Sequence, residues 1–115
     1  MVPIQTVREM AMSLPEVTER PAWGMPCFRV REKIFVSVAD DEETIGVAVS
    51  KEDRAALCAS DPAKFFYREG HDTNYNWMRV RLSAVDPSEL RELITDAWRL
   101  KAPKRLVTAY DAAHS

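Results

Sequence analysis

The fold of this chain is decided by a stretch near its start, residues 23–30, which reads Trp23-Gly24-Met25-Pro26-Cys27-Phe28-Arg29-Val30. Phe28 and Val30 alternate with Arg29, and a period of two is typical of a strand with one buried and one solvated face. A second stretch, residues 76–82, has the same design and reads Asn76-Trp77-Met78-Arg79-Val80-Arg81-Leu82. The two stretches predict strands of one antiparallel sheet whose outer face carries arginines.

The rest of the sequence predicts a two-layer domain around these strands. The spacing of apolar residues predicts helices over 3–14, 51–59, 87–102 and 104–112, and strands over 28–31, 34–38, 44–49 and 77–82. We expect a brief turn of helix over 61–66 and a polar loop over 68–76. Helices on the apolar face of an antiparallel sheet of four to five strands give an α+β two-layer sandwich, with helices on one face.

Length and composition indicate a single domain over residues 1–115. The chain has 46% apolar and 30% charged residues, which is close to the average for a globular protein. It contains neither the apolar stretch of a signal peptide nor a run long enough for a membrane span. We therefore expect a cytoplasmic monomer or weak homodimer that makes no contact with a membrane.

The residue types that carry chemistry are sparse. Cys27 and Cys58 lack a CxxC pattern, so we expect reduced structural thiols, although Arg29 and Arg31 would lower the pKa of Cys27 if they shared its face. His71 precedes Asp72, but no nucleophile or second histidine lies beside it. Carboxylates near the first helix are too scattered for a metal site. The sequence predicts no enzymatic activity, no cofactor and no metal.

Positive charge is concentrated in three segments. Residues 20–37, 76–82 and 99–105 together carry a net charge of +9, whereas the whole chain carries −2, so the remainder carries −11. Nucleic-acid binding needs cations for phosphates and aromatic rings for bases. The candidate phosphate contacts are Arg29, Arg31, Lys33, Arg79, Arg81, Lys104 and Arg105, and the candidate stacking residues are Trp77, Tyr75 and Tyr67.

Several motifs in this order resemble those of the MmcQ/YjbR family of small bacterial proteins. They are Leu14-Pro15, the run 23–30, Lys33-Ile34-Phe35, Trp77-Met78-Arg79-Val80, and residues 97–107 with their Ala-Pro-Lys-Arg core. The resemblance covers nearly the full chain. It implies a YjbR-type α+β fold, related in shape to the bacterial frataxin homologue CyaY, and a label of DNA-binding protein without a catalytic motif. Cys27 stands where relatives often have threonine or alanine, so no thiol role is implied.

Two functions therefore remain open: DNA binding through a basic sheet face, and recognition of another protein. The isoelectric point of 5.7 is low for a dedicated nucleic-acid binder, and arginine and aromatic residues also serve as anchors of protein interfaces. Trp23 and Trp98 are expected to be core anchors. Arg79 is expected to be solvated, so that Arg79→Ala would change stability by only about 0.5 kcal/mol.

Overall fold

The computed structural model describes residues 1–114 and contains one six-stranded antiparallel sheet with four helices. The strands are β1 (Val17–Glu19), β2 (Cys27–Val30), β3 (Lys33–Val38), β4 (Thr44–Ala48), β5 (Phe65–Phe66) and β6 (Trp77–Arg81), and their order in the sheet is β1-β2-β3-β4-β6-β5. The helices are α1 (Ile4–Met12), α2 (Lys51–Ser60), α3 (Pro87–Lys101) and α4 (Lys104–Ala113). The α+β class is confirmed.

The two outermost strands were not predicted, so the expected count of four to five strands is wrong. β1 lies in a polar stretch, and β5 occupies part of the segment where a turn of helix was expected. Both strands are only two or three residues long, which is too short to show a period of two. Their backbone pairs with longer neighbours, β2 and β6, and this pairing, available only in the folded sheet, makes them strands.

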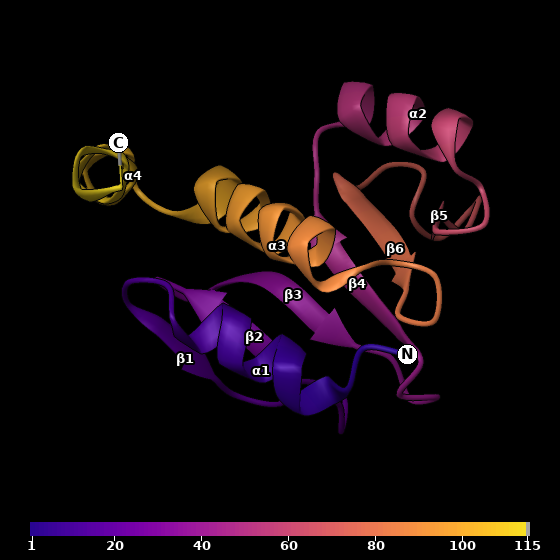
Figure 1. Ribbon diagram of the computed structural model, residues 1–115, viewed down its shortest axis with the longest axis horizontal. Coiled ribbons are helices and arrows are strands. Elements are labelled where there is room, and N and C mark those ends of the chain that lie inside the picture. The colour runs from indigo at the N-terminus through magenta and orange to yellow at the C-terminus, as the bar shows by residue number, and fades with distance from the viewer. Residues whose placement is uncertain (115) are drawn as a thin grey trace.

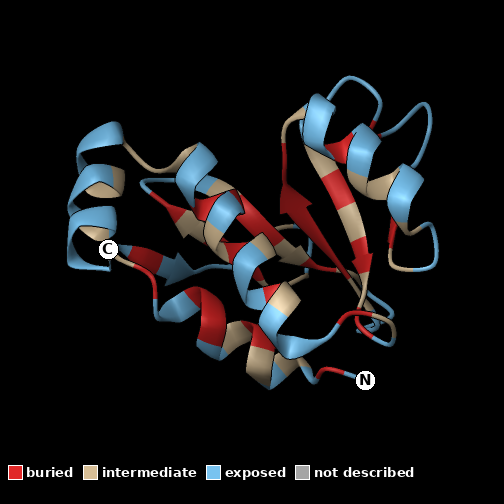
Figure 2. Cartoon of the chain, turned by 45° about the horizontal axis from the view of Figure 1, so that its top comes forward, coloured by how far each residue is buried: buried red, intermediate tan, exposed pale blue. Residues whose placement is uncertain are grey.

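The helices lie on one face of the sheet, as predicted. α1 and α3 lie side by side over the sheet, and α3 packs on β3 and β4 while α2 packs on β5 and β6 (Figure 1). The largest core side chains, among them Phe28, Met78 and Trp98, are fully buried between these layers, and the outward faces of the helices are exposed (Figure 2). No helix among the described residues is long and apolar enough to cross a membrane.

Helix starts are the local features that the sequence predicts best. The Ser50 hydroxyl accepts a hydrogen bond from the Asp53 amide at the start of α2, and the Asp86 carboxylate accepts one from the Glu89 amide at the start of α3. Both caps follow from short sequence patterns and need no tertiary contact. They fix where the two helices begin beside the central strand β4.

The β2–β3 hairpin turns at Arg31 and Glu32, which have φ angles of 48° and 71°. A two-residue turn with both central residues in the left-handed region matches the right-handed twist of its strands. Arg31 therefore lies in the turn, although the sequence predicts a strand over 28–31. In the turn, Arg31 does not follow the alternation of the strand residues before it.

Candidate functional site

Arg79 is not the solvated cation that the sequence predicts. It points to the sheet face away from the helices, because its strand neighbours Met78 and Val80 are fully buried in the core. The loop over residues 67–76 folds across this face and brings Asp72 to Arg79, with Nε–Oδ2 and Nη2–Oδ1 distances of 2.9 and 3.2 Å. The Arg79 side chain is only 14% exposed and that of Asp72 only 2%. This ion pair is part of the structure of the domain.

The electrostatics of Asp72 follow from its partners. Burial opposes ionisation, but the Arg79 guanidinium, the Arg68 amide and the His71 ring outweigh it and hold the pKa of the Asp72 carboxyl well below its usual range. The Arg68 amide and His71 Nδ1 lie 2.9 and 2.7 Å from the carboxylate oxygens. Asp72 is therefore ionised at neutral pH and organises the loop, and its contact with His71 is one of the bonds that hold this carboxylate.

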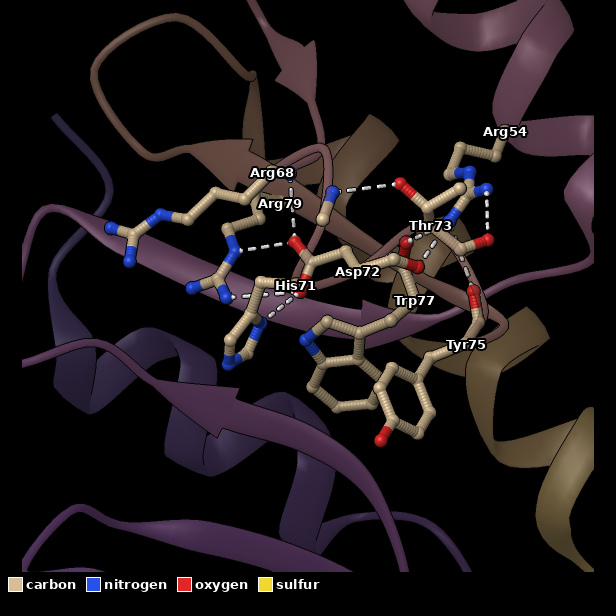
Figure 3. A network of polar contacts seen from close by, with 9 residues as sticks. Arg54, Arg68, His71, Asp72, Thr73, Tyr75, Trp77 and Arg79 are labelled. Carbon is tan, nitrogen blue, oxygen red and sulfur yellow. Dashed lines mark hydrogen bonds and ion pairs between the residues drawn. The ribbon is translucent and has the colours of Figure 1, made fainter.

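Arg54 holds the same loop from the opposite side. Its Nη1 donates hydrogen bonds to the carbonyl oxygens of Asp72, Tyr75 and Trp77 at 2.9–3.1 Å, and its Nη2 donates to that of Thr73 (Figure 3). Arg54 is the only residue of α2 that is buried. The loop is thus fixed by two arginines, Arg79 from β6 and Arg54 from α2.

The sequence analysis did not single out Arg54, although a signal for it exists. Arg54, Leu57 and Cys58 share one face of α2 at helical spacing, and both Leu57 and Cys58 pack against the core. An arginine on the inward face of a helix must find several acceptors. The carbonyl groups of a long polar loop could have been considered as those acceptors.

Arg81 and Arg31 also have partners. Arg81 donates to the Pro62 carbonyl at 3.1 Å, and its guanidinium lies 4.1 Å from the centre of the Phe66 ring. Arg31 pairs with Glu16 at 2.5 Å and lowers the pKa of that carboxyl. Arg31 thus serves an ion pair at the end of the sheet. The arginine face predicted from the alternation is largely occupied by intramolecular contacts.

Arg29 is part of a strand, as the sequence predicts. It lies in the middle of β2, half-buried, and its Nη1 is 3.5 Å from the Glu32 carbonyl oxygen, while its Nε is buried without a hydrogen-bond partner within residues 1–114. Glu32 also pairs with Arg20 at 2.6 Å. The carboxylate beside Arg29 reduces the positive charge that this part of the sheet would offer to a phosphate.

Besides Arg31, three predicted cations are exposed: Lys33, Lys104 and Arg105. None of these three forms an ion pair with another residue of the described range 1–114. Arg105 lies near enough to Glu16 to help lower the pKa of its carboxyl, so the start of α4 approaches the Arg31–Glu16 pair. Four of the predicted basic residues therefore fall into two groups. Arg31 and Arg105 lie near Glu16, whereas Arg79 and Arg81 of β6 are occupied by contacts within the chain.

The predicted stacking residues are divided in the same way. The Tyr67 ring lies 4.1 Å from the guanidinium carbon of Arg54, and Trp77 lies so close to Gly46 that a Cβ there would collide with its indole ring. Tyr75 is 66% exposed at the tip of the clamped loop. Of the three predicted stacking residues, Tyr75 is therefore the one that is exposed to a ligand.

Trp23 is the aromatic residue that the sequence analysis misplaced. It was expected in the core, but 88% of it is exposed. Trp23 and Gly24 form a two-residue turn with φ angles of 52° and 76°, closed by reciprocal 3.0 Å hydrogen bonds between Ala22 and Met25. The Trp-Gly pair before a strand was a usable signal for a hairpin tip, since such turns need positive φ.

Both thiols are at least half-buried, and burial disfavours their ionised form. Cys27 is buried, and burial raises the pKa of its thiol despite the nearby Arg29. The alternative of a pKa lowered by arginines is therefore wrong. Cys58 is half-buried and free, and burial raises the pKa of its thiol as well. Among residues 1–114 no three His, Cys, Asp or Glu side chains are placed to hold a metal ion.

Comparisons with known proteins agree with this architecture. The sequence pattern of the family described as YjbR matches residues 12–100. Uncharacterized proteins from Mycobacterium bovis and Mycobacterium tuberculosis are 41% identical over 94 residues, which is 77% of this chain and 71% of theirs. The crystal structure of Deinococcus radiodurans protein DR2400, with a DUF419 domain, has a TM-score of 0.73 at 19% identity and covers 87% of this chain and 78% of its own.

A more distant likeness in fold is to a DUF1801-family protein from Bacillus subtilis, with a TM-score of 0.52 at 18% identity, covering 84% of this chain and 75% of that one. At these identities both solved structures are similar to this chain in fold alone. Nothing in their descriptions names a ligand or a reaction. The surface of this chain is therefore the guide to its function.

Proposed function

The chain belongs to the YjbR family, and from that premise we propose that it is a non-enzymatic module that binds another protein, with Trp23 as the anchor. The observation that carries the proposal is the 88% exposure of this tryptophan at a hairpin tip. Tryptophan is among the residues that contribute most to binding at protein interfaces. An exposed indole does not stabilise the folded monomer through burial. A partner that covered the ring would gain this favourable burial on binding.

The backbone beneath Trp23 is rigid. The Arg20 amide donates to the Cys27 carbonyl and the Val38 amide donates to the Pro26 carbonyl, both at 2.9 Å, so both arms of the tip are tied to the sheet. A non-glycine residue at positive φ costs about 1–2 kcal/mol. The tip therefore holds the backbone of Trp23 in a strained and fixed position, and a preorganised backbone loses little entropy on binding.

The charge near the tip favours a protein over nucleic acid. Pro26 is hydrogen-bonded to the end of β3, after which the exposed acidic turn Asp40-Asp41-Glu42-Glu43 follows directly. These carboxylates would repel phosphates that approach this end of the sheet. A partner that buries Trp23 would have an apolar pocket with cations or neutral groups at its margin.

Replacing Trp23 with asparagine tests the proposal. Asparagine tolerates positive φ, and Asn-Gly is a favoured two-residue turn. The free energy of unfolding of Trp23→Asn should therefore be no lower than that of the wild type and at most about 1 kcal/mol higher. The immobilised wild type should capture a partner from nuclease-treated lysate of the source organism, and Trp23→Asn should lose it. Tyr75→Ala, which removes another exposed ring, is the matched control and should retain the partner.

The proposal fails if no captured protein depends on Trp23. It fails also if capture disappears when nuclease is added, because the contact would then run through nucleic acid.

Nucleic-acid binding is the second candidate, and it is favoured by the exposed, unpaired Lys33, Lys104 and Arg105. If these cations contact phosphates, the affinity for a random DNA duplex should fall with salt by a log–log slope of roughly −0.9 per contact. Lys33→Glu and Arg105→Glu should each reduce that slope. Fluorescence anisotropy at low salt measures the effect, and absence of binding there would exclude this candidate.

A further inference from the structure

A groove with a volume of about 570 Å³ runs between α2 and α3 above β4, on the helix side of the sheet shown in Figure 1. Val47 and Val49 form its floor, Leu57 projects from α2, and Leu93 and Leu100 project from α3. Leu100 is 53% exposed, so an apolar side chain stands open at one end of the groove. The volume lies within the range of roughly 300–1,000 Å³ typical of binding pockets.

The rim of the groove is acidic. Its lining carries four carboxylates, from Asp53, Glu89, Glu92 and Asp96, and one cation, Arg99. Lys64, outside the lining, pairs with Glu89 at 2.9 Å. Arg99 is already engaged with Asp96 and Asp111 at 2.9 Å each. Asp53 and Glu92, one on each wall, have no ion-pair partner within residues 1–114. The groove thus combines an apolar base with uncompensated negative charge on both sides.

The backbone around the groove decides the shape of its occupant. β4 pairs with β3 on one side and with β6 on the other, so no open strand edge faces the groove. The two walls are helices, whose amide and carbonyl groups are bonded within each helix. An extended peptide would find few backbone partners there and would leave its own polar groups unpaired. A helix satisfies its own backbone.

We propose that this groove binds a cationic amphipathic helix of a partner protein. The apolar side chains of that helix, at positions i, i+3 or i+4, and i+7, lie on Val49, Leu93 and Leu100, and its lysines and arginines lie beside Asp53 and Glu92. Complementary charge sets the partner and its orientation. Trp23 does not line the groove, so this inference concerns a separate surface and stands even if the Trp23 anchor fails.

The test uses a synthetic peptide as the probe: a fluorescein-labelled helix with leucine on one face and lysine on the other. A scrambled peptide of the same composition, which cannot form an apolar face, is the matched control. Fluorescence anisotropy should give saturable binding of the amphipathic peptide to the intact protein, roughly tenfold or more tighter than the scrambled peptide. Equal affinity for the two peptides would show charge attraction only and would overturn the proposal.

Two surface variants locate the site. Glu92→Lys reverses a rim charge and Ala56→Leu fills the groove from the α2 wall, and each should weaken binding roughly tenfold. Glu69→Lys makes the same charge change outside the groove, and Trp23→Asn changes the hairpin tip, so both should bind as the wild type does. Thermal unfolding confirms that each variant is folded.

Unchanged affinity in both groove variants would overturn the assignment. Self-association of the free protein that is lost in Glu92→Lys would instead place a second copy in the groove, and that outcome would overturn the assignment to a separate partner.

Discussion

Arg79→Ala should lower the free energy of unfolding by about 3–5 kcal/mol, because it leaves the buried Asp72 carboxylate without its guanidinium partner. A loss of this size is a large part of the total stability of a domain, which is about 5–15 kcal/mol. The expectation drawn from the sequence alone was a change of about 0.5 kcal/mol. Chemical denaturation of the wild type and of Arg79→Ala gives the change in the free energy of unfolding and so decides between these two values.

Arg91→Ala is the matched control, since Arg91 is an exposed arginine on α3. It should change stability by no more than about 0.5 kcal/mol. The double variant Arg79→Ala/Asp72→Ala should be less destabilised than the sum of the two single variants, with a coupling of about 0.5–3 kcal/mol. Additive effects of the two substitutions would contradict the ion pair.

The pH dependence of stability gives an independent readout of the same pair. The pKa of Asp72 is lower in the folded protein than the value of about 3.9 for an unfolded chain. Its contribution is therefore complete above about pH 5 and is lost as the pH falls below 4 toward the folded pKa. Asp72→Asn should be less stable at neutral pH, and the difference from the wild type should shrink as the solution is acidified. A constant difference would contradict the ionised state of Asp72.

Trp98→Ala should also cost about 3–5 kcal/mol, because it removes the largest fully buried side chain of the core. The Trp98 indole Nε1 donates a 3.1 Å hydrogen bond to the Pro15 carbonyl, and its ring lies 5.2 Å from that of Tyr110. One side chain thus joins the end of α1, the core and α4. Denaturant unfolding followed by far-UV circular dichroism gives the loss of stability.

Trp98→Phe separates the two contributions of this residue. It keeps an aromatic ring, smaller than the indole, and removes the N–H donor, so it should cost about 1–3 kcal/mol for the unpaired Pro15 carbonyl and the lost ring atoms. Equal losses for Trp98→Phe and Trp98→Ala would mean that the hydrogen bond, and not the packing, dominates at this position.

The sequence predicted the parts of the fold that depend on local patterns. Helix caps at Ser50 and Asp86, the strands led by Phe28 and Trp77, and the burial of Trp98 all follow from periodicity or short motifs, and the structure confirms them. The failures occur where the partner of a residue is distant in sequence. β1 and β5 are strands only because β2 and β6 lie beside them.

The candidate site shows the same division. Alternation correctly predicted that Arg79 points away from the helices, but it could not show that the loop over residues 67–76 folds back over it. Trp23 looked like a core residue because tryptophan usually is one, and only the turn at Ala22–Met25 reveals that nothing packs on it. The α2–α3 groove has no signature in the sequence, since its two walls and its floor come from three separate elements.

The sequence by itself determined the family, the α+β class and the identity of the main core residues, because hydrophobic periodicity and capping are encoded within a few neighbouring positions. Only the tertiary structure decided which charges and rings remain free to bind. A side chain is available to a partner when no distant segment occupies it, and the arrangement of distant segments is fixed only when the chain has folded. Asp72 therefore occupies Arg79, whereas Trp23 stays exposed and the rim carboxylates Asp53 and Glu92 form no ion pair within residues 1–114.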